Sequence, residues 1–188
     1  PMADPEFLLL GDALWLEFVN TAHTPPGPVD TLADPGAWLR WTKAVRLEPP
    51  ADRAGFTEAR AFRARLLALA HALDDGRSPP PSVVEAVNTR LAALDGREQL
   101  VRVGGSWRLR FQPARPPTAL QAIALSAAQT LANPLVLVRH CANPDCAVYF
   151  VDESAQQSRR WCSPSRCGQR GRYERRRGTR PVPIVADA

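Results

Sequence analysis

The spacing of apolar residues predicts that the first 134 residues form a mainly helical domain. Between about residues 53 and 75, apolar side chains recur every three or four positions with arginines between them, which is typical of a long amphipathic helix. Residues 13–20 are almost all apolar and predict a shorter, mostly buried helix. Two more helices are predicted after Asp34 and after Thr118, because both are good N-cap residues and Pro35 suits the first helical position.

Local signals predict where these elements end and what lies between them. Gly76 is placed to end the long helix, and Ser82 with Glu85 predicts a capping box for the next helix. The predicted apolar stripe of that helix comprises Val84, Val87, Leu91 and Leu94. Residues 99–103 and 107–111 alternate between apolar and polar around two glycines, which predicts a β-hairpin. The apolar residues 7–10 predict a short edge strand.

Charge is distributed unevenly along the chain. Residues 139–180 contain ten arginines and four acidic residues, a net charge of +6, whereas the rest of the chain carries a net charge of −1. A near-neutral body with a strongly basic C-terminal segment indicates a polyanionic partner, most often nucleic acid. The N-terminus is acidic and the chain has no apolar run of 18 residues, so we expect neither a signal peptide nor a membrane span, and a cytoplasmic location.

The four cysteines of the chain lie in the basic segment and form two close pairs. The spacing is Cys-x4-Cys, fifteen intervening residues, and Cys-x4-Cys, with Cys141, Cys146, Cys162 and Cys167 as members. Two close pairs of thiolates are what one structural Zn²⁺ needs for a tetrahedron, and four thiolates leave no open position for catalysis. The alternative is four buried thiols or two disulfides, and disulfides are rare in the cytoplasm.

The segments around the cysteines predict a treble-clef-like zinc module. Residues 147–151 are expected to form a strand after the first pair, with residues 135–139 as its hairpin partner. Ser163-Pro164 predicts an N-cap and first helical residue, which places Cys167 in the first turn of a helix running to about residue 177. The expected fold class is therefore mainly α with a small β-hairpin (α+β). It divides into a helical N-terminal domain at 1–134, the four-cysteine zinc module at 135–180 and a tail at 181–188.

Arginines crowd the segment that follows the second cysteine pair. Their guanidinium groups match phosphate geometry and can also read guanine in a major groove. The predicted nucleic-acid contacts are Arg159, Arg160, Arg166, Arg170, Arg172, Arg175, Arg176 and Arg177. Two other interpretations stay open, because such a run can be only a solvated face and can also bind acidic protein partners.

Taken together, these residues resemble a known pair of domains. The run from Cys141 through Asp152, Trp161 and Cys167 to the arginine cluster is similar to the CGNR zinc finger, although the signature asparagine is Gln169 here. Upstream, residues 11–21 and 32–35 with Trp41 resemble the ABATE domain. The resemblance implies a bacterial, stress-induced transcription regulator in which a sensory domain, binding a small-molecule effector or a partner, is joined to a DNA-binding finger. It implies association with the nucleoid.

Two other classes of function compete with this interpretation. An RNA-binding or protein-interaction zinc module is the alternative, because arginine-rich zinc modules also suit RNA phosphates. For an enzyme, the polar candidates in the body are Glu17, Asn20, His23 and His71, but no paired carboxylates, nucleophile elbow or phosphate loop accompanies them, so we expect no catalysis. His140 is expected to neighbour the zinc site without joining it.

The aromatic and polar residues of the first helices are the candidates for an effector pocket. The pocket would be sought near Trp15, Asn20, His23, Trp38 and Trp41, for which plain core packing is the competing interpretation. Asn20 is the most notable of them, because a buried amide after an apolar run must find hydrogen-bond partners. The sequence shows no heptad repeat, so a homo-oligomer is left open.

Overall fold

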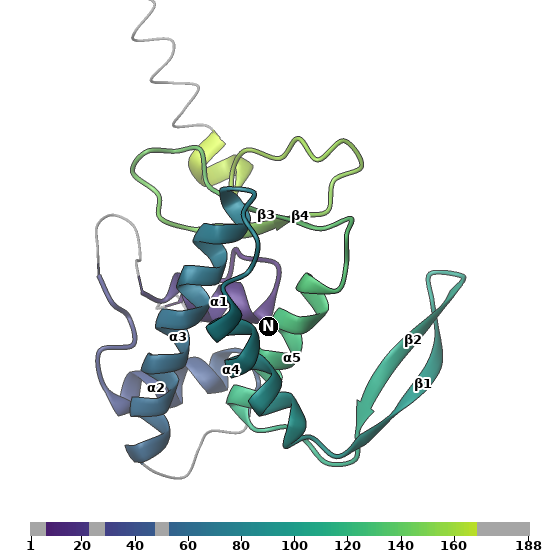
Figure 1. Ribbon diagram of the computed structural model, residues 1–188. Coiled ribbons are helices and arrows are strands. Elements are labelled where there is room, and N and C mark those ends of the chain that lie inside the picture. Colours follow the sequence, from purple (N-terminus) through teal and green to yellow (C-terminus); the bar gives the residue numbers. More distant parts are fainter. Residues whose placement is uncertain (1–6, 23–28, 48–52, 169–188) are drawn as a thin grey trace, which may run out of the picture.

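The computed structural model describes residues 7–22, 29–47 and 53–168. In these ranges five α-helices gather into a body, one β-hairpin projects from it, and a second hairpin lies across one end (Figure 1). The helices are α1 Leu14–Asn20, α2 Pro35–Ala44, α3 Arg53–Asp74, α4 Pro81–Ala92 and α5 Ala119–Leu131. The predicted α+β class is confirmed. None of the described helices is long and apolar enough to cross a membrane.

Most predicted helix boundaries are confirmed by the hydrogen bonds at the helix ends. The Asp34 side chain accepts a 2.8 Å bond from the amide of Ala37 at the start of α2. Thr118 and Gln121 form a reciprocal capping box at the start of α5. Beyond α3 the chain turns at Gly76, whose φ of +67° is one that a residue without a Cβ adopts readily.

Two local predictions were wrong. The capping box of Ser82 and Glu85 does not form, because α4 begins two residues earlier than predicted, with Pro80 as N-cap and Pro81 in the first helical position. The buried stripe of α4 accordingly comprises Val83, Ala86 and Val87, with the predicted Val84 and Leu91 only partly buried. Residues 8–10 form no strand, since the amide of Leu10 bonds to the Glu17 carboxylate rather than to a neighbouring strand.

The core of the body is built around aromatic side chains from the first two helices. Trp38 and Trp41 stack with ring centroids 5.4 Å apart, and Phe18 of α1 lies 5.2 Å from Trp41. Arg63 of α3 is only 5 % exposed and makes a bidentate ion pair with Asp30, at 2.8 and 2.6 Å, in the segment that leads into α2. This pair, in which Arg63 is buried and Asp30 half-buried, holds the α1–α2 connection against α3, and no pattern in the sequence predicted it.

The predicted hairpin is formed by β1 Gly96–Val103 and β2 Ser106–Pro113, which pair antiparallel. Gly104 and Gly105 both have positive φ, as a tight two-residue turn between twisted strands requires. The hairpin extends away from the helices (Figure 1). None of its side chains joins the apolar core of the described residues.

The second hairpin connects the body to the cysteine segment. Its strands, β3 Leu137–His140 and β4 Tyr149–Asp152, were both predicted, and they lie across the C-terminal end of α3 (Figure 1). There the carboxylate of Asp74 accepts a 2.8 Å bond from the amide of His140. Val138, Tyr149 and Val151 belong to the same apolar core as the helices. The boundary at residue 134 stays a prediction, but packing is continuous across it.

Candidate metal centre

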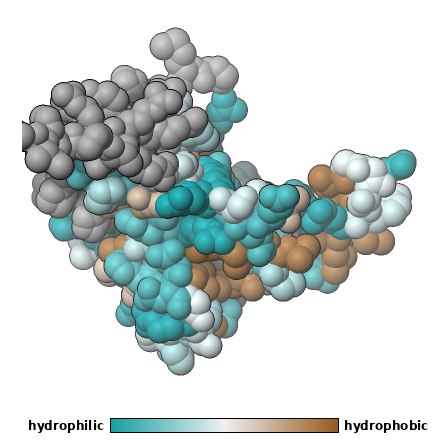
Figure 2. Space-filling view, turned by 90° about the horizontal axis from the view of Figure 1, so that it is seen from above, coloured by the Kyte–Doolittle hydropathy of each residue, from teal (hydrophilic) through white to brown (hydrophobic). Residues whose placement is uncertain are grey.

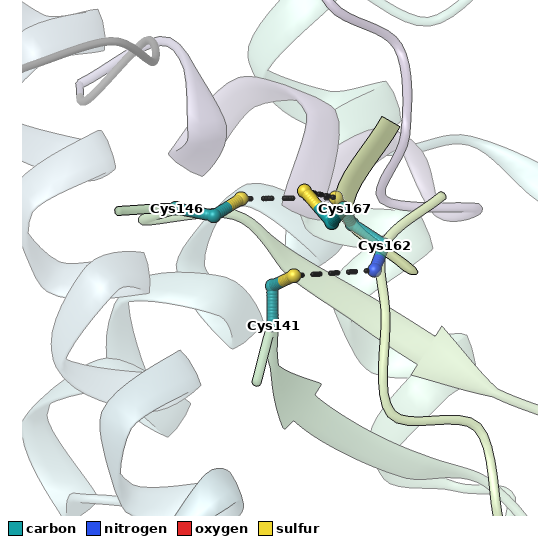
Figure 3. A group of neighbouring side chains, drawn as sticks. All are labelled: Cys141, Cys146, Cys162 and Cys167. Carbon is teal, nitrogen blue, oxygen red and sulfur yellow. Dashed lines mark hydrogen bonds between the residues drawn. The ribbon is translucent and has the colours of Figure 1, made fainter. Parts of the chain in front are cut away.

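The four cysteine side chains converge on one point between the second hairpin and the short helical segment η1 Pro164–Gly168 (Figure 3). All four sulfur atoms lie within 4.8 Å of one another. The Cys146 and Cys162 sulfurs are 3.7 Å apart, and those of Cys162 and Cys167 are 3.6 Å apart. Four sulfurs at about 2.3 Å from a tetrahedral Zn²⁺ would be about 3.8 Å apart, so the cluster fits that ion. The separations exclude disulfides, whose S–S bond is about 2.05 Å long.

Each cysteine pair is shaped by a turn of the backbone. In the first, Asn143 accepts a 2.9 Å bond at its carbonyl from the amide of Cys146, and the Cys141 amide donates to Val148 at 2.9 Å. In the second, the Cys167 amide donates to the carbonyl of Ser163 at 2.9 Å, and the Ser163 hydroxyl accepts from Arg166. The predicted N-cap at Ser163 is therefore confirmed. The knuckle, hairpin and final helical turn form the expected treble-clef-like arrangement.

The electrostatics of the cluster favour a bound cation. Hydrogen bonds from Cys146 and Cys162 hold the pKa of the Cys141 thiol far below its usual range. The amide of Cys162 adds a contact to the Cys141 sulfur at 3.5 Å. Once Cys141 carries the negative charge, its hydrogen bond to Cys146 raises the pKa of Cys146 to about 12, and the pKa of Cys162 is raised as well. Four crowded sulfurs thus cannot all ionise alone, and a divalent cation removes this repulsion.

A small apolar cluster surrounds the sulfurs and separates them from solvent. All four cysteines are at most 8 % exposed, and Val148 and Phe150 pack beside them with Leu10 and Trp161. Gly168 lies against Trp161, and a Cβ at this glycine would come 3.2 Å from the indole ring. With four thiolates as ligands and an apolar surround, the site fits one structural Zn²⁺, and four thiolates on the ion would leave no position for a substrate.

Asp152 organises the loop between the two cysteine pairs. It is fully buried, and its carboxylate accepts bonds from the amide and hydroxyl of Ser154, from the amide of Arg159 and from the Arg139 guanidinium. Burial alone would raise the pKa of Asp152, but these donors outweigh it and the pKa lies below its ordinary value. The Asp-x-Ser spacing is a local turn signal that could have indicated this role.

Of the predicted arginine contacts, only three fall among the described residues. Arg159 is used within the finger and at its contact with the body. Its guanidinium bonds to the carbonyls of Trp161 and Cys162 and to Asp12 of the body, and lies 4.3 Å from the centroid of the Phe150 ring. Arg160 and Arg166 are exposed. The remaining predicted contacts, Arg170, Arg172, Arg175, Arg176 and Arg177, lie outside the described residues, as does Gln169.

Asn20 joins the body to the finger. Its amide nitrogen donates to the carbonyl of Tyr149 at 2.9 Å, and its amide oxygen accepts from the Tyr149 amide at 2.8 Å. Two positions along β4, the amide of Val151 donates to the carbonyl of Gly11 at 3.0 Å. The body therefore satisfies the outer edge of β4, which would otherwise present unpaired backbone groups.

The other residues of the predicted pocket are packed in the core. Trp15 donates its indole N–H to Thr130 at 2.9 Å, while Trp38 and Trp41 stack on each other. Asn20 and Trp41 line a cavity of about 10 Å³, which is about the room of one water molecule. His23 lies outside the described residues. His71 is exposed beside Tyr149, and His140 stands next to Cys141 without joining the metal cluster.

Glu17 supports the segment that the finger rests on. Its carboxylate accepts bonds from the amides of Leu10 and Gly11 at 2.9 Å and from Asp12 at 3.2 Å. Burial raises the pKa of Glu17 to about 7, and the negative charge of the nearby Asp12 adds to this rise. The three hydrogen bonds act in the opposite direction but do not outweigh burial.

The stability of the protein should therefore depend on the protonation of Glu17. Between its ordinary value of 4.5 and about 7, the folded state holds a proton that the unfolded state has lost. The contribution of Glu17 to the free energy of unfolding is fully present at the acidic end of that window. It falls as the pH rises through the window, by up to about 1.4 kcal/mol per pH unit. Glu17→Gln should flatten this slope, measured by urea unfolding of both proteins at pH 5 and pH 7.5 with zinc in excess. Equal slopes for the two proteins would contradict the assignment.

Comparison with known protein families supports both halves of this description. A family named ABATE, described as "Putative stress-induced transcription regulator", matches residues 12–134. The CGNR zinc finger matches residues 138–180. A search of the curated proteins found no match. Neither matching family is a family of enzymes. The two resemblances inferred from the sequence are thus confirmed.

Proposed function

The chain belongs to the ABATE family, and on this basis we propose that it is a bacterial transcription regulator which binds DNA through its zinc-ordered finger. The observation that carries the proposal is the closed four-cysteine site, which is built to hold a structure rather than to perform a reaction. It would fix η1, which directly precedes the arginine-rich residues 170–177 in the sequence, so zinc binding would position the start of that segment. A regulator of this kind works in the cytoplasm, on the nucleoid.

The exposed arginines of the finger are the proposed phosphate contacts. Arg160 precedes Cys162, and Arg166 precedes Cys167, so both guanidinium groups are carried by backbone that the metal holds in place. Arg159 is left out of the proposed interface, because its donors are already used by Asp12 and by carbonyls of the finger. The arginines from 170 to 177 would extend the same interface.

The helical body is the proposed sensor. A groove of about 770 Å³ lies between β2, α5 and the end of β4, a volume in the range of small-molecule sites. Its lining includes Arg110 of the projecting hairpin, Ser126 and Thr130 of α5, and Glu153 of the finger. We place the effector here rather than among the packed tryptophans, because an effector in this groove would touch the body and the finger at once and could bias their arrangement.

Binding to duplex DNA at two salt concentrations tests the DNA-binding proposal. We expect the zinc-loaded protein to enrich a sequence motif from random duplexes, with affinity that falls steeply as salt rises. Arg160→Ala combined with Arg166→Ala should weaken binding to every sequence and reduce the salt slope by about 0.9 for each phosphate that is no longer neutralised. Arg65→Ala, at an exposed position of α3, is the matched control and should change neither quantity.

A structured RNA pool in the same experiment separates the alternatives. If the protein bound structured RNA more tightly than duplex DNA, the proposed function as a transcription regulator would be wrong and RNA binding would take its place. Affinity that does not change with salt would show that the arginines are not phosphate contacts, and the finger would then be a protein-interaction module.

A further inference from the structure

The projecting β1–β2 hairpin exposes apolar side chains that the body does not cover. Leu100 and Trp107 are each 67 % exposed and Leu109 is 59 % exposed. Figure 2 shows apolar side chains along the projecting arm. Within the described part of the chain, β1 and β2 pair only with each other. A lone two-stranded hairpin is only marginally stable in water, so this arm is expected to gain stability from a partner.

The register of the hairpin separates its side chains into two unlike faces. Alternate residues point to the same side, and Leu100 stands opposite Leu109 while Glu98 stands opposite Phe111 and Arg102 opposite Trp107. We call these six residues the apolar face: Glu98, Leu100, Arg102, Trp107, Leu109 and Phe111. The other side carries Arg97, Arg108 and Arg110 beside Gln99, Gln112, Val101 and Val103. Its three arginines have no acidic residue on the same side, so it would repel a second copy of itself.

We propose that the apolar face is an interaction surface for a second copy of this chain. The charges of the face carry this inference. On β1, Glu98 and Arg102 stand on either side of Leu100, four residues apart and on the same side. No salt bridge within the described residues involves either of them. The face has one acidic residue, one basic residue and apolar side chains between them. Its net charge is therefore zero, and it would not attract a polyanion such as nucleic acid.

Two copies of the apolar face can be stacked on each other about a two-fold axis that lies in the plane midway between them and runs perpendicular to the strands. In this arrangement the residues of the two faces are complementary. The axis reverses the strand direction and lays β1 of one copy over β1 of the other. Leu100 then meets Leu100 of the second copy, Leu109 meets Leu109, and Trp107 meets Phe111. Glu98 of each copy meets Arg102 of the other, which makes two identical ion pairs, as an isologous interface requires. A partner unrelated in sequence would not need this self-complementary order of residues.

The proposal does not depend on DNA binding and is tested without nucleic acid. Sedimentation velocity of the full-length, zinc-loaded chain should show a reversible, concentration-dependent change from the 20.6 kDa monomer to twice that mass. Glu98→Arg places two arginine pairs in the interface, and Arg102→Glu places two glutamate pairs there. Each single substitution should weaken the dimer by about tenfold or more, because like charges face each other.

Mixing the two single variants gives the decisive measurement. A mixed dimer has only opposite charges in contact, so an equimolar mixture should recover wild-type association, as should the double variant Glu98→Arg with Arg102→Glu. Recovery also shows that each single variant is folded. Arg97→Glu, next to Glu98 but on the other face, is the control and should leave the dimer unchanged. A wild-type chain that is monomeric at every concentration, or a mixture that stays monomeric, would overturn the proposal.

Discussion

Replacing Cys162 with serine should abolish stoichiometric zinc binding and unfold the finger. The Cys162 sulfur is the central member of the cluster, within 3.7 Å of the Cys146 sulfur and 3.6 Å of the Cys167 sulfur. The apolar cluster around the metal contains few side chains besides the cysteines, so the metal must supply much of the folding free energy of the finger. In zinc-finger peptides that contribution is about 10 kcal/mol or more.

Two measurements on the Cys162→Ser protein check this expectation. Metal analysis after dialysis should fall from one zinc per chain to none, and hydrogen exchange should show that β3 and β4 are no longer protected. The helical signal of the body should persist, with unfolding at a lower urea concentration because Val138, Tyr149 and Val151 leave its core. Ala142→Ser, at an exposed position in the same knuckle, is the control and should keep the metal. Complete loss of the helical transition would show that body and finger fold only as one unit.

Replacing Asn20 with leucine should destabilise the contact between body and finger while leaving the zinc ligands intact. The substitution removes both hydrogen bonds to Tyr149, so the buried backbone amide and carbonyl of Tyr149 lose their partners. An unsatisfied buried group costs about 1–3 kcal/mol, so the two groups together should cost roughly 2–6 kcal/mol of stability. Asn20→Asp keeps an acceptor for the Tyr149 amide but sets a buried carboxylate oxygen against the Tyr149 carbonyl, so it should also destabilise the contact at neutral pH.

Urea unfolding of the zinc-loaded proteins measures this effect. Asn88→Ala, at an exposed position of α4, is the matched control and should stay within about 0.5 kcal/mol of the wild type. A zinc content of one per chain in the Asn20→Leu protein would separate this contact from metal binding. A change of stability no larger than that of the control would mean that the outer edge of β4 finds other partners.

In the proposed regulator, the contacts between body and finger would carry a signal from one to the other. Besides Asn20, the body holds the finger through the carbonyl of Gly11 on Val151 and through the ion pair of Asp12 with Arg159. Glu17 binds the amides of residues 10–12 and so fixes the segment from which these contacts come. In the proposed regulator, an effector that moved this segment would shift the finger with it.

Features that depend on neighbouring residues could be predicted from the sequence alone. Helix starts at Asp34 and Thr118, the turn at Gly104 and Gly105, and the strands beside the cysteines all follow from local backbone preferences. The zinc ligands were also predictable, because a metal requires several specific side chains in close pairs and few other roles do so. The capping box at Ser82 failed because Pro80 and Pro81 offered a competing helix start.

The roles of the polar residues in the body emerged only from the packing of distant segments. From the sequence, Asn20 was a candidate for an effector pocket and Glu17 a polar candidate for an enzyme. Packing against a segment 129 residues away makes Asn20 a partner of β4. The same holds for Arg159, which by its position alone resembled the exposed arginines around it but bonds instead to Asp12 and the finger backbone. Hydrogen bonds between distant segments leave no periodic trace in a sequence, because they depend on where the packed elements place their backbone groups.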